Sequence, residues 1–193
     1  MPSRPSRPPA PGPEPPSEFA IERDVPVGRH SLLEVFPGLD TLPIAKKVDT
    51  SAKGRAALFR ETAIEVVRAD LWMYVAPTEI PPHRRGWQPV VSPDQDCIVV
   101  GRTHLRTSPA IVLYMDIYHE LCHVRQRRHG ANLWEPGVSY VERATEIEAY
   151  QVVVEDARRL GASDAFLREY LEVEWVSAAE HRRLLRTLGV PAS

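Results

Sequence analysis

The chain has 193 residues, enough for one ordinary domain with a hydrophobic core. Its formal charge of −2 at pH 7 gives no broad basic surface, so we do not expect a nucleic acid as its partner. Its longest apolar runs, such as residues 109–115, are far shorter than the roughly 18 to 20 residues that span a bilayer, so we expect no membrane partner either.

Residues 1–18 are proline and polar residues almost throughout, with eight prolines among the first 17 residues. Such a segment buries too little apolar surface to offset the entropy lost on ordering, so we predict a disordered tail and a folded domain at residues 19–193. The tail lacks the apolar core of a secretory signal. Two cysteines, Cys97 and Cys122, do not make a disulfide framework, so we expect a cytoplasmic protein.

Between residues 50 and 102 the pattern predicts one helix and two strands. Apolar residues recur at mixed helical spacings over residues 50–70, after a Thr/Ser capping signal, which favours an amphipathic helix. Residues 71–76 and 96–102 are short apolar runs typical of strands. Residues 81–95 lie between them, and their prolines predict a loop.

The next segment predicts a helix that is marked at both ends. Ser108 is a good N-cap, Pro109 fits the first helical position, and Gly130 is the glycine that commonly follows a helix. Two further helices are predicted at residues 140–160 and 163–188. The marked helix carries an apolar stripe that we expect to face the core: Tyr114, Ile117, Leu121 and Val124.

Two histidines four residues apart, His119 and His123, lie on this helix, where one turn brings them to the same face. Neutral imidazoles bind Zn²⁺ at about 2.0 to 2.1 Å, and a carboxylate outside the coordination shell can take a proton from a zinc-bound water. The motif His-Glu-Leu-Cys-His therefore predicts two zinc ligands with Glu120 as general base. Cys122 lies on another face, and we expect it to be a buried, inert thiol.

A catalytic zinc needs a third protein ligand. His129 lies six residues after His123, a spacing seen in metzincins, but Gln126 stands where that arrangement needs a glycine to break the helix. If the helix continues, His129 is rotated by about 240° from His123 and serves instead as a cation at the helix end. The other candidates are two glutamates of the next helix, Glu142 and Glu146.

The string HELCHVRQ, followed by EIEAY at residues 146–150, resembles the gluzincins, zincin metallopeptidases in which a downstream glutamate completes the HExxH site. It looks most like small bacterial metallopeptidase domains, and the resemblance covers about residues 110–156. It implies an α+β zincin-like fold with a small sheet, a backing helix, an active-site helix and a glutamate-bearing helix. It also implies that residues 96–102 form the edge strand of the sheet, where an extended peptide can bind.

By this resemblance Glu146 is the third ligand. Several gluzincins have an aspartate four residues later that orients a histidine, but this chain has Tyr150, whose hydroxyl is a weaker orienting group. If Glu142 is the ligand instead, Glu146 becomes the orienting residue. Glu148, about 200° around the helix from Glu146, is expected in solvent.

The resemblance thus implies a zinc metallopeptidase that hydrolyses peptide bonds in a peptide or protein substrate. Its Zn²⁺ is bound by His119, His123 and Glu146, and Glu120 activates the water. The alternative is a regulatory or stress-response protein that uses the zincin scaffold for binding, without turnover. Four side chains can in principle donate to an oxyanion, but we expect an ordinary packed or surface role for each: Tyr118, Tyr140, Tyr150 and His181.

Overall fold

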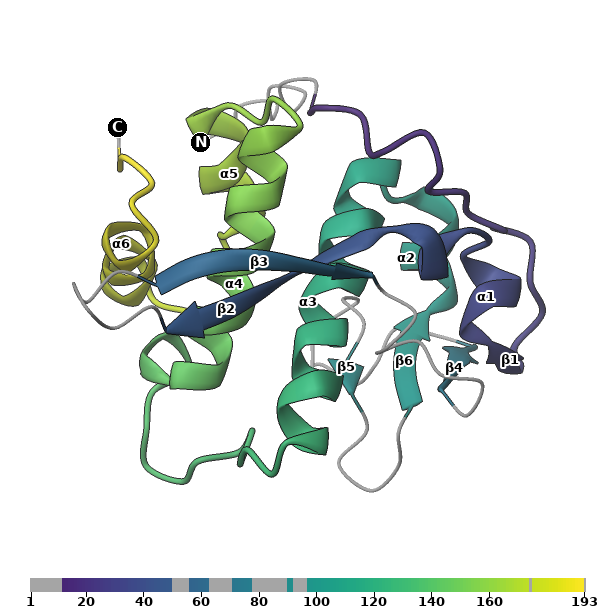
Figure 1. The fold of residues 1–193 in the computed structure, drawn as a ribbon, viewed down its shortest axis with the longest axis horizontal. Helices are drawn as coiled ribbons and strands as arrows, with labels where there is room; N and C mark the ends of the chain where they lie inside the picture. The colour runs from purple at the N-terminus through teal and green to yellow at the C-terminus, as the bar shows by residue number, and fades with distance from the viewer. Residues whose placement is uncertain are drawn as a thin grey trace, which may run out of the picture.

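The computed structural model describes residues 12–49, 56–62, 71–77, 90–91, 97–173 and 175–192 (Figure 1). Residues 1–11 of the predicted tail, and most of the predicted loop at 81–95, lie outside this described part. The fold is a mixture of α and β, as predicted. The elements in chain order are β1 (Gly28–Ser31), α1 (Leu32–Val35), η1 (Leu39–Thr41), β2 (Pro43–Asp49), β3 (Ala56–Thr62), β4 (Trp72–Ala76), β5 (Val90–Val91), β6 (Cys97–Gly101), α2 (Arg102–Thr107), α3 (Ala110–Arg128), η4 (Tyr140–Glu142), α4 (Ala144–Arg159), α5 (Asp164–Tyr170) and α6 (Ala178–Thr187).

Four strands form one sheet in the order β1-β4-β6-β5. The strands predicted at residues 71–76 and 96–102 are confirmed as β4 and β6, which pair in parallel with Trp72 opposite Cys97. The expectation that residues 96–102 form an edge strand is wrong, because β5 pairs antiparallel with β6 on its other side. β5 comes from the predicted loop, where proline content gave no sign of two residues that pair with a later strand.

β2 and β3 form a separate antiparallel pair that crosses α3 and α4 in Figure 1. The register runs from Pro43 opposite Thr62 to Asp49 opposite Ala56. The helix predicted at residues 50–70 is therefore wrong for residues 56–62, and its remaining residues lie outside the described part. The backbone hydrogen bonds of this segment go to a partner strand, and side-chain spacing within the segment does not report that partner.

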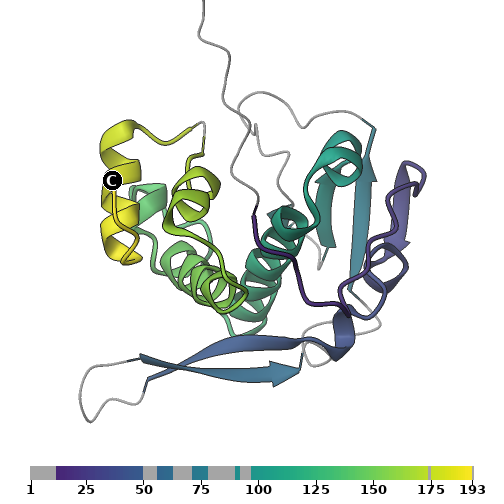
Figure 2. The same cartoon turned by 90° about the horizontal axis from the view of Figure 1, so that it is seen from above.

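α3 is the central element, with the four-stranded sheet on one side and helices α4 to α6 on the other (Figure 2). Every residue of α3 from 113 to 126 is buried. The stripe that contains Tyr114 and Leu121 is buried as predicted, but the face that carries the histidines is buried too, because α4 packs against α3. Near the start of α3, Tyr114 donates a hydrogen bond of 2.6 Å to Asp156 Oδ2 near the end of α4. The two helices are therefore antiparallel neighbours.

The ends of α3 differ slightly from the prediction. Gly130 follows the helix in the left-handed region with φ +83°, as expected for a terminating glycine. At the start, Pro109 is the N-cap, and Ser108 instead ends α2. The Ser108 hydroxyl lies 2.8 Å from His104 Nδ1, so it is used within α2 and does not cap α3.

The C-terminal part contains one more break than predicted. The helix expected at residues 163–188 is two helices, α5 and α6. The Ser177 hydroxyl accepts from the Glu180 N–H at 3.3 Å, and the Glu180 carboxylate accepts from the Ser177 N–H at 3.0 Å. This capping box begins a new helix inside a segment whose apolar pattern alone looked continuous.

Within the described residues, none of the helices combines the length and the apolar character needed to cross a membrane.

Candidate metal centre

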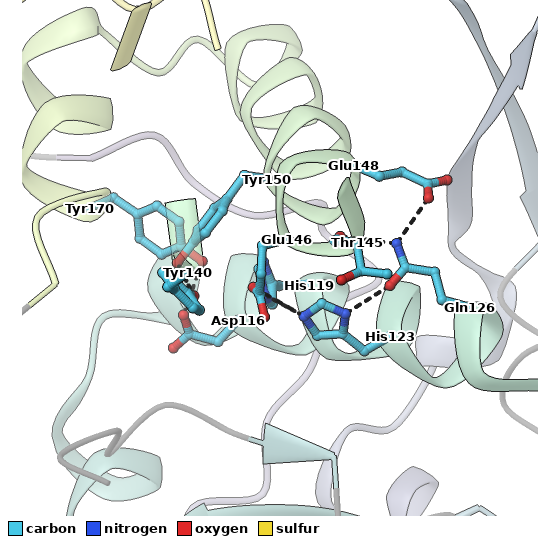
Figure 3. A network of polar contacts seen from close by, with 10 residues as sticks. All are labelled: Asp116, His119, His123, Gln126, Tyr140, Thr145, Glu146, Glu148, Tyr150 and Tyr170. Carbon is cyan, nitrogen blue, oxygen red and sulfur yellow. Dashed lines mark hydrogen bonds and ion pairs between the residues drawn. The ribbon is translucent and has the colours of Figure 1, made fainter. Parts of the chain in front are cut away.

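The buried part of α3 carries an unusual number of polar side chains. Asp116, His119, Glu120, His123 and Gln126 are each less than a tenth exposed. Buried polar groups destabilise a fold unless they find partners, so each needs a structural or functional explanation. This face of α3 meets α4, and the candidate site lies between the two helices (Figure 3).

His119 and His123 meet because they lie one helical turn apart on α3. Their Nε2 atoms are 2.9 Å apart, and their rings are nearly perpendicular, with centroids 4.6 Å apart. Glu120 also belongs to this group, since one ligand atom from each of these three residues lies within 4.8 Å of the other two. The HExxH residues therefore form a buried group that could hold a metal ion.

Glu146 reaches this group from the first turn of α4. Its Oε2 atom lies 3.3 Å from His119 Nε2 and 3.4 Å from His123 Nε2. The same oxygen is buried and has no hydrogen-bond partner among the described residues. The structure thus brings together two imidazole nitrogens and one carboxylate oxygen from two helices, and these are three of the residues singled out from the sequence.

The three groups shift one another's pKa values. Burial lowers the pKa of His119, and the neighbouring His123 lowers it further. Burial also disfavours charge on His123, but its contacts with Glu146 and the charge of Glu120 outweigh this and raise the pKa of His123 to about 9. Burial favours the neutral form of Glu146, yet the two histidines hold its pKa well below the usual range. At neutral pH the metal-free site therefore contains an ionised Glu146, a protonated His123 and a neutral His119.

On its far side, the His123 ring is held by hydrogen bonds. Its Nδ1 lies 2.8 Å from Gln126 Oε1. The Gln126 amide nitrogen donates to the Thr145 carbonyl at 3.0 Å and to Glu148 Oε2 at 2.9 Å. Glu148 is also paired with Arg125 at 3.4 Å, and only 27% of its side chain is exposed. The expectation that Glu148 points into solvent is wrong, because α4 lies close enough for it to reach α3.

The His119 ring is held mainly by aromatic packing. The Tyr150 ring lies against it with centroids 4.5 Å apart, and the Tyr150 hydroxyl shares a hydrogen bond of 2.8 Å with Tyr140. The sequence offers the Tyr150 hydroxyl as a weak orienting group for His119. In the structure this hydroxyl bonds to Tyr140 instead, and the ring contacts His119. The Nδ1 atom of His119 is buried without a hydrogen-bond partner among the described residues. Tyr140 in turn packs edge-on against Trp175, whose side chain is about half exposed.

Asp116, one turn before His119 on α3, belongs to a neighbouring buried cluster. Its Oδ2 lies 2.7 Å from His104 Nε2, and Tyr170 donates to its Oδ1 at 3.1 Å. These contacts join α2 and α5 to the part of α3 that carries the histidines. Both carboxylate oxygens have partners, so we interpret Asp116 as an anchor beside the site.

The remaining candidates lie away from the three converging atoms. Glu142 is paired with Arg183 of α6, and its side chain is 48% exposed. His129 sits at the C-terminal end of α3 with Nδ1 2.8 Å from the Arg125 carbonyl, which is the helix-end position expected for it. Cys122 is fully buried, and burial raises the pKa of its thiol to about 12, as expected for an inert cysteine.

Sequence reasoning missed the contribution of Gln126 and Glu148. In the sequence, Gln126 is notable only because it occupies the position where metzincins have a glycine. The signal that could have found it is spacing, because a residue three positions after His123 lies on the same helix face and can reach its ring.

Comparisons of the chain with models of protein families, with curated proteins and with solved structures give no match. What the site can do is therefore argued from its own side chains. Two imidazoles and one carboxylate converge between two helices, and a further carboxylate, that of Glu120, adjoins them.

Proposed function

We propose that the protein is a zinc-dependent peptidase in which His119, His123 and Glu146 hold the metal and Glu120 acts as general base. The observation that carries this proposal is the convergence of His119 Nε2, His123 Nε2 and Glu146 Oε2, with separations of 2.9, 3.3 and 3.4 Å. Side chains from two helices are brought to one point in a buried site where, without an ion, the Glu146 oxygen has no hydrogen bond among the described residues.

The spacing of these atoms fits a zinc site. In a tetrahedron with ligands about 2.0 to 2.1 Å from the ion, the ligand atoms are about 3.3 to 3.4 Å apart. The two distances from Glu146 agree with this value, and the distance between the imidazoles needs to open by only a few tenths of an ångström. Two imidazoles with one carboxylate is also a donor set typical of catalytic zinc, whereas Mg²⁺ and Ca²⁺ favour oxygen ligands alone.

Each residue then has a defined task. When bound, zinc supplies a Lewis acid that polarises a peptide carbonyl and increases the acidity of water. The Glu120 carboxylate accepts a proton from the attacking water and returns it to the amine nitrogen as the C–N bond breaks. Burial of the histidines and of Glu146 excludes competing water from the atoms that hold the ion. The substrate class is a peptide or protein segment.

The test compares the wild-type chain with Glu120→Gln, and with Glu155→Gln as a control for the same charge change on an exposed residue of α4. We expect stoichiometric zinc in all three proteins, by elemental analysis. Cleavage of a proteome-derived peptide library should be detectable for the wild type and Glu155→Gln, and lost in Glu120→Gln.

Three results would count against the peptidase. A wild-type protein without bound zinc would rule out the proposed metal centre. Cleavage retained in Glu120→Gln would rule out Glu120 as the general base. Stoichiometric zinc with no cleavage that depends on Glu120 would instead favour a binding or regulatory protein on the same scaffold.

A further inference from the structure

The orientation of the Gln126 amide follows from its three partners. The Thr145 carbonyl and the Glu148 carboxylate can only accept hydrogen bonds, and they lie 3.0 and 2.9 Å from one end of the amide. That end must be the nitrogen. The oxygen end therefore faces His123 Nδ1, at 2.8 Å.

This orientation decides which ring nitrogen of His123 is available to an ion. A carbonyl oxygen accepts and cannot donate, so His123 Nδ1 must carry the hydrogen and donate it to Gln126. The nitrogen left to bind a metal is then Nε2, the atom that faces Glu146 and His119. Gln126 thus fixes both the tautomer and the direction of the His123 ring.

The same amide also holds the turn of α4 that carries Glu146. Its two donor bonds go to Thr145 and Glu148, the residues on either side of Glu146 along that turn. The single side chain of Gln126 therefore contacts His123 on α3 and, on α4, the two residues Thr145 and Glu148 that flank Glu146. In Figure 3, dashed lines join the Gln126 amide to His123 and to Glu148, and Thr145 lies close to the same amide.

We infer that Gln126, held in place by Glu148, is the positioning residue of the metal centre: it sets the register between the α3 ligands and the α4 ligand. This role rests on the proposed zinc site, and it does not depend on whether the site hydrolyses peptides. Outer partners of this kind orient a ligand without touching the metal, and losing one typically weakens metal binding by about 10- to 100-fold.

Zinc affinity tests this inference, measured by competition with a chromophoric chelator on the full chain. We expect Gln126→Ala to weaken zinc binding by about 10- to 100-fold. Gln126→Glu should weaken it at least as much, because it places a second carboxylate against Glu148 and the Thr145 carbonyl. Glu148→Gln should have a smaller effect, since its new side chain still offers an oxygen to the Gln126 amide.

The double variant Gln126→Glu/Glu148→Gln separates positioning from general destabilisation. In it, the carboxylate at position 126 still accepts from His123 and also accepts from the new amide at position 148. We therefore expect tighter zinc binding than in Gln126→Glu alone. The absorption spectrum of bound Co²⁺, which reports the ligand geometry, should return toward that of the wild type in the double variant and depart from it in Gln126→Ala.

Tyr114→Phe is the matched control, because it removes a different α3–α4 hydrogen bond, the one between Tyr114 and Asp156 at the far ends of the two helices. Asp156 is ten residues beyond Glu146, about 15 Å along the helix. We expect a less stable protein with unchanged zinc affinity. Should Gln126→Ala fail to fold, as judged by circular dichroism, Glu148→Gln and the double variant carry the test.

Four outcomes would overturn the inference. Wild-type zinc affinity in Gln126→Ala would do so, as would a double variant that binds zinc no more tightly than Gln126→Glu. Equal losses of zinc affinity in Tyr114→Phe and Gln126→Ala would mean that Gln126 acts only by holding the two helices together. A wild-type chain that binds no zinc would overturn the metal centre and this role together, whereas zinc binding without proteolysis would overturn the peptidase alone.

Discussion

The two histidines of the candidate site have the same side chain, lie on the same helix and face the same carboxylate, yet they are supported in different ways. His123 is held by a chain of directional hydrogen bonds through Gln126 to Glu148. His119 is held by contact with the ring of Tyr150, and its Nδ1 has no hydrogen-bond partner among the described residues. Hydrogen bonds select a tautomer, whereas ring packing sets only the position and plane of a ring. Changes on the His123 side should therefore act on metal affinity, and changes on the His119 side should act first on stability.

We expect the largest effect on zinc affinity from a change at Glu146, which contacts both His119 and His123. Glu146→Gln keeps the shape of the side chain but removes the charge that contacts both imidazoles. We expect zinc affinity to fall by more than the roughly 100-fold that marks the upper range for outer partners. The measurement is chelator competition, with the exposed Glu155→Gln as control for charge loss on the same helix. An unchanged affinity would assign the carboxylate ligand to Glu120, which lies in the same group of potential ligand atoms.

The second effect concerns stability on the His119 side. Tyr150 is almost completely buried, so Tyr150→Ala should lower the free energy of unfolding of the metal-free protein by about 3 to 5 kcal/mol, as for other large aromatic truncations. Tyr150→Phe keeps the ring and loses only the hydrogen bond with Tyr140, which should lower it by about 1 kcal/mol. Urea denaturation with a common m-value measures both.

The same pair of variants separates ring from hydroxyl in metal binding. Because the ring, and not the hydroxyl, contacts His119, zinc affinity should be nearly unchanged in Tyr150→Phe. If Tyr150→Phe weakened zinc binding as much as Gln126→Ala, the two histidines would be supported alike, and the contrast between the two sides would be lost.

The elements that could be predicted are those indicated by the spacing of residues close together in the sequence. α3 is marked by its own apolar repeat and by Gly130, and the meeting of His119 with His123 follows from one helical turn. β4 and β6 are short apolar runs of strand length. In each case the information lies within the segment itself.

The parts that could not be predicted depend on which segments meet. β3 has its partner in β2, and β5 pairs with a later strand, so side-chain spacing within either segment was no guide. Gln126 and Glu148 acquire their roles only because α3 and α4 pack closely enough for an amide to bridge them. From the spacing on one helix alone, Gln126 is notable only because it stands where a metzincin has a glycine. Glu148 lies about 200° around its helix from Glu146, so the same spacing predicts that it faces solvent.

The dependence of zinc binding on pH distinguishes the two histidines most directly. In the metal-free site the pKa of His123 is raised to about 9, whereas that of His119 is lowered. Between about pH 6.5 and 9 a zinc ion must therefore displace one proton, from His123, so its affinity should rise by about tenfold per pH unit and level off near pH 9. Competition titrations across this range in buffers of different ionisation enthalpy measure both the slope and the proton released. Glu146→Gln removes a contact that raises this pKa, so in that variant the levelling should move to lower pH. A wild-type curve that levels near pH 6.5 would mean that His123 titrates as an ordinary histidine and that its contacts with Glu146 and Gln126 do not distinguish it from His119.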